Sequence, residues 1–279
     1  MIQGPLELLA SALLHATWNA LLKRERRPQA AVLAVLAAAL GFAVVAALVV
    51  PGAGFPTRAG FLWSAVAGIF EGIYFLTLAA ALGRATYGVV YAVARGGALL
   101  VVWPAAFLWF QEPVPLRAVA GAILVGVGVA AVAATGHERA SRTGMALAAA
   151  CAAAIGGYHL CYDRALREGA SPAPVFAVAL AVALPLAWAA ARRAGQVAAP
   201  VSRGDTLRRV VAGALATASF LLFLDGLSRS GAGVALTLRN TSVVFAQLLA
   251  LLLGERVPPR QWIGAALVAL GAAVLTPPG

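Results

Sequence analysis

Hydrophobic residues along the chain fall into ten long runs that are separated by polar gaps. A helix that crosses the hydrocarbon core of a bilayer needs about 20 mostly apolar residues, and each run is close to that length. Most gaps are short, so successive helices are expected to be antiparallel neighbours. The longest polar stretch, 192–209, is rich in arginine. The ten predicted spans are residues 5–22, 29–50, 60–82, 86–110, 115–134, 144–164, 172–191, 208–228, 232–253 and 260–276.

Composition supports this interpretation. Of the 279 residues, 62% are hydrophobic and 11% are charged, whereas an average soluble domain is about 45–50% apolar and about 25% charged. A soluble domain, a disordered chain and a nucleic-acid-binding domain are therefore excluded. The strands of a membrane β-barrel alternate apolar and polar residues. This alternation is absent from the sequence, so a β-barrel is not expected. We expect an all-α, multi-pass protein of a cell membrane, in a bacterium the inner membrane.

The distribution of positive charge predicts the orientation. The net charge is +11, and nearly all lysines and arginines lie in the gaps between apolar runs. Fourteen of them lie in the odd-numbered gaps and five in the even-numbered gaps. Because cytoplasmic loops carry the excess of Lys and Arg, we expect the odd gaps in the cytoplasm and both termini outside. Anionic lipid headgroups are the expected counter-charge.

The chain offers little for cofactor chemistry. Its two cysteines, Cys151 and Cys161, are ten residues apart on one predicted helix, which places them about 15 Å apart and too far for a disulfide. No cysteine-based metal site can be built from two such residues. We expect no cofactor and no metal.

A segment of the first half recurs in the second. Residues 112–130 and 255–273 are identical at ten of 19 positions, at an offset of 143. An offset near half the chain predicts two units of five helices, 1–137 and 138–279. Because five is odd, the second unit must enter from the opposite side. The predicted fold is therefore ten transmembrane helices in two inverted five-helix repeats, as in many secondary transporters.

Motifs in three spans point to a family. His15-Ala-Thr-Trp-Asn19, Tyr91-Ala-Val-Ala-Arg95-Gly96 and Leu238-Arg-Asn-Thr-Ser242, with the five-plus-five repeat, resemble the EamA-type carriers of the drug/metabolite transporter superfamily. The resemblance covers the whole chain and implies a secondary carrier, with efflux as the expected direction. The chain departs from the pattern at Ala92, where the related branch usually has proline, and at Asn240, where it often has glutamate.

Two arginines, Arg95 and Arg239, lie inside predicted spans 4 and 9, which are equivalent helices of the two units. An arginine at membrane depth is costly, so it usually faces a cavity or a partner. Both are expected to bind an anionic group such as a carboxylate or a phosphoryl oxygen. The alternative is that each is paired with an acid or with carbonyls and ties helices together.

Glu71 is the candidate acid, in the middle of span 3, with Tyr74 on the same face. It could bind a substrate amine, carry a proton, or pair with Arg95. Tyr91 lies one turn before Arg95 and offers a hydroxyl to the same space. Two arginines and one acid favour a zwitterionic or anionic solute over a lipophilic cation.

Further candidates lie in spans 1, 6 and 9. His15, Trp18 and Asn19 share one helical face, and the histidine is a candidate proton relay or a packing residue. Tyr158 in span 6 and Asn240 in span 9 complete the predicted solute-binding set. Tyr162, Asp163 and Asp225 lie near span ends and are expected to be interfacial anchors. Glu112 and Glu255 are expected to close tight interhelical turns.

The function predicted from the sequence is a secondary active transporter of a small polar or anionic metabolite, working by alternating access with proton coupling or exchange. Within the same class, a carrier of phosphonates or other phosphorylated compounds and a lipid-linked sugar flippase remain open. A passive channel and a membrane-embedded enzyme are the rival classes. The three scattered histidines argue against an enzyme. The expected partners are a small-molecule solute and membrane lipid, with no nucleic acid, and the chain is expected as a monomer or homodimer.

Overall fold

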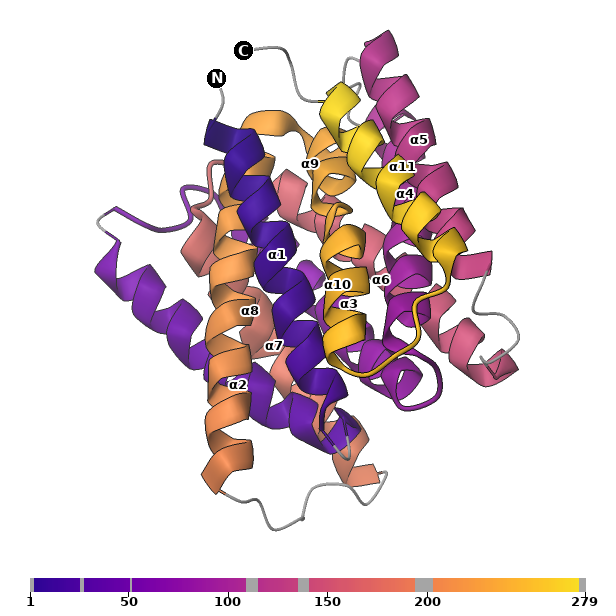
Figure 1. Ribbon diagram of the computed structural model, residues 1–279. Helices are drawn as coiled ribbons and strands as arrows, with labels where there is room; N and C mark the ends of the chain where they lie inside the picture. The colour runs from indigo at the N-terminus through magenta and orange to yellow at the C-terminus, as the bar shows by residue number, and fades with distance from the viewer. Residues whose placement is uncertain are drawn as a thin grey trace.

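The computed structural model describes residues 3–25, 28–50, 52–108, 115–134, 141–193 and 203–275, all of them helices and their connections. Figure 1 shows the bundle that they form. The helices are α1 (Gln3–Lys23), α2 (Pro28–Val49), α3 (Arg58–Leu82), α4 (Tyr87–Leu108), α5 (Leu116–Ala134), α6 (Arg142–Arg167), α7 (Pro172–Arg193), α8 (Arg203–Ser230), α9 (Ala232–Arg239), α10 (Ser242–Leu252) and α11 (Pro259–Leu275). The predicted all-α fold is confirmed, and the described residues of the predicted spans lie almost entirely in helix.

The ninth span differs from the prediction, because it is divided. A turn at Asn240 and Thr241 separates α9 from α10. The turn is tight: the Thr241 amide donates to the Leu238 carbonyl at 3.1 Å, and the Val243 amide donates to the Asn240 carbonyl at 2.9 Å. These bonds connect residues three apart, which is 3₁₀ geometry and often marks a functional position within a helix. Arg239 is the last residue of α9 and lies directly at this break.

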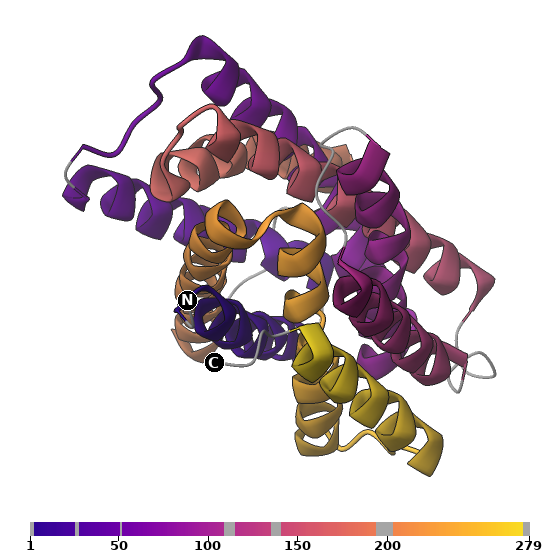
Figure 2. The ribbon, with the colours of Figure 1, turned by 90° about the horizontal axis from the view of Figure 1, so that it is seen from above.

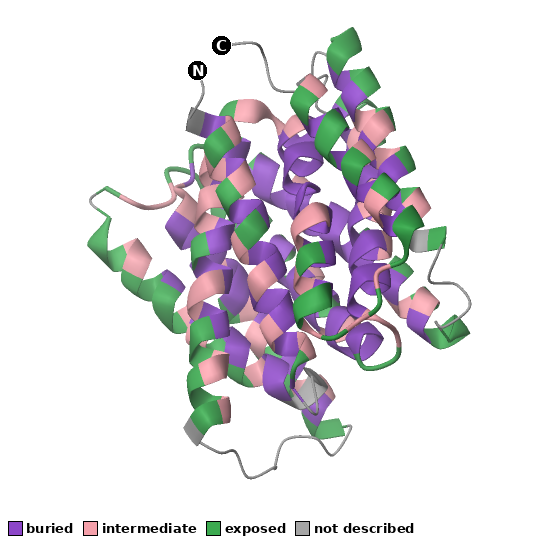
Figure 3. Ribbon diagram, viewed as in Figure 1, coloured by how far each residue is buried: buried purple, intermediate pink, exposed green. Residues whose placement is uncertain are grey.

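Seven stretches of the described chain are long and apolar enough to cross a membrane: α2 from Ala31, α3, α4, α6, α7, α8 from Gly204, and α9 with α10 taken together. A shorter apolar helix covers Leu116–Val132 of α5. Large apolar side chains are exposed, among them Leu48 at 80%, Leu100 at 80% and Leu116 at 84%. Exposed residues lie mainly along the outside of the bundle, and buried ones in its interior (Figure 3). Such a surface suits contact with lipid hydrocarbon.

Most helices pack mainly against one or two others. The largest helix contacts pair α3 with α6 and α7, α4 with α6, α8 with α1 and α2, and α5 with α11. The last pair lies at one side of the bundle, as Figure 2 shows from above. The start of α1 and the end of α11 lie at the same end of the bundle (Figure 1), as the predicted even number of spans requires.

At the opposite end, charged residues connect the end of α1 to other helices. The Lys23 ammonium donates to the carbonyls of Leu82 and Ala85 at 2.8 and 2.9 Å. The Glu25 carboxylate pairs with Arg208 at 2.9 Å and Arg209 at 2.7 Å. Lysine and arginine from the first and seventh gaps therefore gather at one end, as the charge distribution predicts.

Small residues let α5 and α11 approach closely. A Cβ added at Gly128 would lie 2.5 Å from the Gly264 carbonyl oxygen, and a Cβ added at Gly264 would lie 2.5 Å from the Gly128 carbonyl oxygen. A Cβ added at Gly271 would lie 2.6 Å from the carbonyl oxygen of Gly121. Close backbone approach at glycine is a common means of helix association in membranes.

We expect Gly128→Ala to destabilise the bundle, because its Cβ would overlap the α11 backbone; overpacking typically costs about 1–3 kcal/mol. Gly126→Ala on the same helix is the matched control, since nothing lies within 4 Å of a Cβ there. Thermal unfolding in detergent should give a lower melting temperature for the Gly128 variant alone. Equal melting temperatures in the two variants would contradict the close approach of α5 and α11.

Candidate functional site

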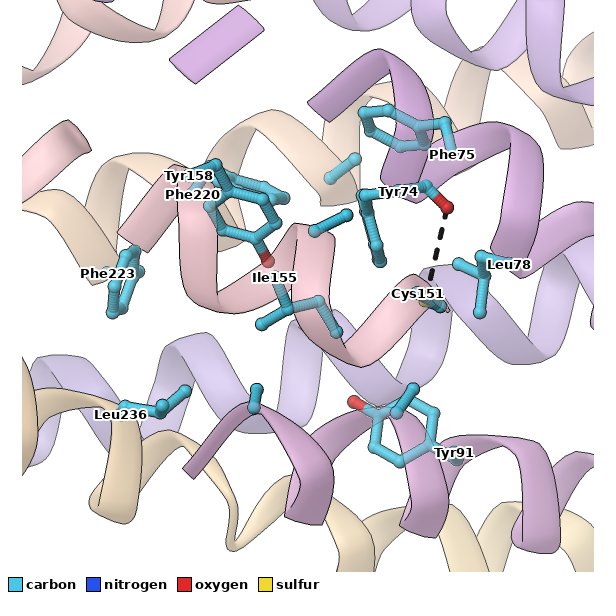
Figure 4. Packing of buried hydrophobic residues seen from close by; sticks show 14 of the residues in the cluster. Tyr74, Phe75, Leu78, Tyr91, Cys151, Ile155, Tyr158, Phe220, Phe223 and Leu236 are labelled. Carbon is cyan, nitrogen blue, oxygen red and sulfur yellow. Dashed lines mark hydrogen bonds between the residues drawn. The ribbon is translucent and has the colours of Figure 1, made fainter. Parts of the chain in front are cut away.

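A cluster of polar side chains lies in the interior where α1, α3, α4, α6 and α9 converge, and none of them is more than 2% exposed. We call these residues the central cluster: His15, Glu71, Tyr74, Tyr91, Arg95, Tyr158, Tyr162 and Arg239. Figure 4 shows Tyr74 and Tyr158 of α3 and α6, with Phe220 and Phe223 of α8, on one side of the interior and Tyr91 of α4 on the other. Seven of these eight residues are among the candidates proposed for solute binding from the sequence, and the structure brings all seven together.

Arg239 is held from two sides. Its Nη2 donates to Nδ1 of His15 at 2.9 Å and lies 3.5 Å from the Ser219 hydroxyl. Its guanidinium carbon lies 4.5 Å from the ring centre of Phe220 and 4.0 Å from that of Phe223, in the range of cation–π attraction. The Nε and Nη1 atoms have no hydrogen-bond partner, so part of the planar fork of donors is available to a ligand.

His15 connects α1 to this arginine and to α3. Because Nδ1 accepts from Arg239, the proton of the neutral imidazole lies on Nε2, which then donates to the Tyr74 hydroxyl at 3.3 Å. The Trp18 indole N–H also points at Nδ1, at 3.4 Å. The Asn19 amide nitrogen donates to the His15 carbonyl at 2.6 Å, while its oxygen has no partner.

Arg95 makes no ion pair with an acid among the described residues. Neither Nη1 nor Nη2 has a hydrogen-bond partner, and its guanidinium carbon lies 5.6 Å from the Tyr91 ring centre. The pairing with Glu71 considered from the sequence is therefore wrong: both Glu71 oxygens also lack a hydrogen-bond partner. Sequence spacing on two separate helices does not determine which side chains face each other.

Glu71 interacts instead with the side chain of Tyr162. Tyr162 is fully buried, so its predicted role as an interfacial anchor is wrong. The reason is that α6 continues to Arg167, past the predicted end at 164, and Tyr162 therefore lies deeper in the bundle. Asp163 pairs with Arg167 at 2.6 Å and Asp225 with Arg229 at 2.7 Å, both near helix ends.

Several residues at the site were not predicted. Ser11 and Ser219 join α1 to α8 by reciprocal bonds, in which each hydroxyl donates to the other residue's carbonyl, at 2.7 and 2.9 Å. Phe220 and Phe223 support Arg239. Ser242 and Gln247 of α10 are fully buried with side chains that lack partners. A polar residue within an otherwise apolar run is the one signal that could have identified the serines and the glutamine.

Of the repeated acids, Glu255 has a structural role, but its side chain binds the start of another helix and not, as was predicted, its own interhelical turn. Its Oε1 accepts from the backbone N–H of Tyr87 at 3.0 Å, and so satisfies a free donor at the first turn of α4. Glu112 lies outside the described residues. Asn240 follows Arg239 at the break between α9 and α10, and both of its amide atoms lack partners.

The unpaired atoms are the most informative property of the cluster. In folded proteins about 90% or more of buried polar groups have a hydrogen-bond partner, because an unpaired one costs free energy. Here Arg95, Glu71, Tyr91 and Tyr158 all present unpaired atoms within one cluster. Such a concentration of donors with one carboxylate is the chemistry of a binding site for a polar, charged molecule.

A comparison with known protein families gives a match in the second part of the chain. Residues 142–276, just under half of the chain, match the model of the EamA-like transporter family. This match is consistent with an EamA-type carrier. The match agrees with the motif resemblance, and with the apolar helices it identifies an EamA membrane transporter fold. The family is one of transporters, which favours a transporter over a membrane-embedded enzyme.

A likeness to a solved structure extends over nearly the whole chain. The superposition on a crystal structure of another protein covers 98% of this chain and 96% of the other. The TM-score is 0.74 and the sequence identity is 24%. At this identity the likeness shows the fold alone. No curated protein matches the chain.

Proposed function

We propose that the chain is a secondary active carrier of a small polar or anionic metabolite, with the solute bound at the central cluster. The observation that carries the proposal is the pair of fully buried arginines whose guanidinium groups have no acid partner among the described residues. A buried cation without a counter-charge is unfavourable. An anionic solute supplies that charge, and the planar forks match a carboxylate or a phosphoryl group.

Each remaining candidate has a role in this proposal. Tyr74, Tyr91 and Tyr158 offer hydroxyl groups to the solute, and His15 holds Arg239 in position. Trp18, Asn19 and Asn240 bound the site at α1 and at the break after α9. Glu71 is the group that carries a proton or receives a substrate amine, because it is the carboxylate of the cluster and has no cation bound to it.

The carrier is proposed to consist of two inverted repeats, residues 1–137 and 138–279. Reciprocal helix packing supports this: α3 packs on α6 and α7, as α8 packs on α1 and α2. The glycine contacts are reciprocal too. Gly121 and Gly264 are equivalent positions at the offset of 143, and so are Gly128 and Gly271. Each of these two glycines of α5 contacts the equivalent of the other one: Gly128 meets Gly264, and Gly121 meets Gly271. Such exchange of partners is what a two-fold axis produces.

Alternating access then follows from rocking of one repeat against the other about the site between them. The arginines suit this mechanism, because Arg95 and Arg239 come from the fourth spans of the two repeats. Export across a bacterial inner membrane, with both termini outside, is proposed from the charge distribution and the family resemblance. Coupling to protons or exchange of solutes would drive it.

A phosphorylated compound or phosphonate is the second candidate solute. The specific observation in its favour is that Arg95 and Arg239 belong to one cluster. Arg95 lies over Tyr91, Tyr91 lies by His15, and His15 binds Arg239. Neither arginine is paired with an acid among the described residues. A dianion compensates two neighbouring cations better than a single carboxylate does.

Counterflow in proteoliposomes tests the carrier proposal. Vesicles loaded with an unlabelled anionic solute should transiently accumulate the labelled solute, because a carrier exchanges one for the other. A panel of carboxylates, phosphates and phosphonates provides the probes. Downhill flux without counterflow would indicate a channel, and no flux of any panel member would contradict a carrier of small anions.

A further inference from the structure

Gln247 is a polar residue that the arginine site does not use. It lies on α10, its side chain is fully buried, and neither its amide oxygen nor its amide nitrogen has a hydrogen-bond partner. The side chain lies against α4: a Cβ added at Gly88 would lie 3.0 Å from Oε1 and 3.2 Å from Nε2. Glycine at position 88 therefore leaves the amide room to lie directly on the α4 backbone.

Two further unpaired hydroxyl groups lie on the same two helices. Tyr91 is one turn after Gly88 on α4, and Ser242 is the first residue of α10. The two hydroxyl groups lie close enough to interact, but neither makes a hydrogen bond of ordinary length and angle. The facing surfaces of α4 and α10 thus carry an amide and two hydroxyls, all neutral, all buried and all unpaired.

This group is continuous with the arginine site through Tyr91. The Arg95 guanidinium lies 5.6 Å from the centre of the Tyr91 ring, so one tyrosine contacts the cation on one side and the neutral group on the other. A solute whose anionic end is bound by Arg95 would extend toward Ser242 and Gln247. Those side chains can both donate and accept hydrogen bonds, and they carry no charge.

We propose that Gln247, Ser242 and Tyr91 form a neutral subsite that binds a hydroxyl or amide group of the transported anion. The substrate class is then a small carboxylate or phosphate ester that bears a hydroxyl or amide group away from its charge. This inference rests on the proposed function, because it assumes that the anionic end lies at the arginines.

The amide of Gln247 does not stabilise the structure described here. A leucine of similar volume would fill the space without leaving a polar group unpaired, and such replacements are nearly neutral or stabilising. A subsite that forms hydrogen bonds with its ligand, in contrast, discriminates strongly against an analogue without the bonding group. Loss of discrimination without loss of stability therefore separates a binding role from a packing role.

The test uses matched pairs of probes: propyl phosphate with glycerol 3-phosphate, and butyrate with 4-hydroxybutyrate. Their affinities are measured on the purified full-length protein in detergent. We expect the wild-type protein to prefer the hydroxylated member of at least one pair by about tenfold. Gln247→Leu should reduce that preference to less than about threefold, leave the affinity for the other member unchanged, and keep or raise the melting temperature.

Gln261→Leu, the same replacement in the first turn of α11, is the matched control and should retain the preference. Equal affinities within both pairs, or a preference that survives in Gln247→Leu, would overturn the subsite while leaving the anion carrier intact. Failure of the wild-type protein to bind any of the four probes or the other anions of the panel would instead reject the proposed function, and the subsite with it.

Discussion

Replacing Arg95 or Arg239 by lysine is expected to lower the affinity for the anionic solute by about 100-fold, with the melting temperature within a few degrees of wild type. Lysine keeps the positive charge but loses the planar fork that bonds an oxyanion through two parallel N–H groups. Two charge-assisted hydrogen bonds at about 1.5 kcal/mol each account for a loss of this size. Stability should persist because no acid is bound to either guanidinium among the described residues.

Affinity and thermal unfolding of the purified variants are the measurements. Arg192→Lys is the matched control, since Arg192 lies over the Trp188 ring near the end of α7, away from the central cluster. It should bind the solute normally. If both central lysine variants bind normally, while Arg95→Ala and Arg239→Ala lose stability and binding together, the arginines tie helices together and do not recognise the solute.

Glu71→Gln is expected to reduce transport driven by a proton gradient by at least about tenfold while counterflow of solute persists. Glutamine has nearly the same shape but cannot take up and release a proton, so it removes the coupling and keeps the site. The protein should still fold, because both carboxylate oxygens lack hydrogen-bond partners that would be lost. Initial rates of both kinds of transport, in the same proteoliposome preparation, provide the comparison.

Glu168→Gln serves as the control, because Glu168 pairs with Arg164 at the end of α6, at 3.2 Å, and should affect neither rate. Unchanged proton-driven transport in Glu71→Gln would contradict a role in coupling. Loss of both transport and solute binding would assign Glu71 to a substrate amine instead.

The sequence predicted the helices well because each apolar run is close to the length that crosses a bilayer. It also predicted the two central arginines, because a charge within an apolar run is conspicuous. It did not predict the break at Asn240, because the run at 232–253 has no proline and remains apolar on both sides.

Which side chains meet across helices was harder to predict. The sequence placed Glu71 and Arg95 on neighbouring spans, but only the rotation of α3 and α4 in the bundle decides that Glu71 lies by Tyr162. Gln247 and Ser219 were overlooked because a single neutral polar residue barely changes the hydropathy of a span. Their significance appears only once their burial and their hydrogen bonds are known.

The most direct test of an anion site at Arg95 and Arg239 is the melting temperature of the detergent-purified protein against anionic, neutral and cationic solutes. A ligand that binds only the folded state adds about 2.7 kcal/mol at 100 times its dissociation constant. At least one carboxylate or phosphorylated solute should raise the melting temperature of the wild-type protein by several degrees, and should fail to do so in Arg95→Lys and Arg239→Lys. Stabilisation by neutral or cationic solutes alone, or equal stabilisation of the wild-type protein and both variants, would contradict an anion site at these arginines.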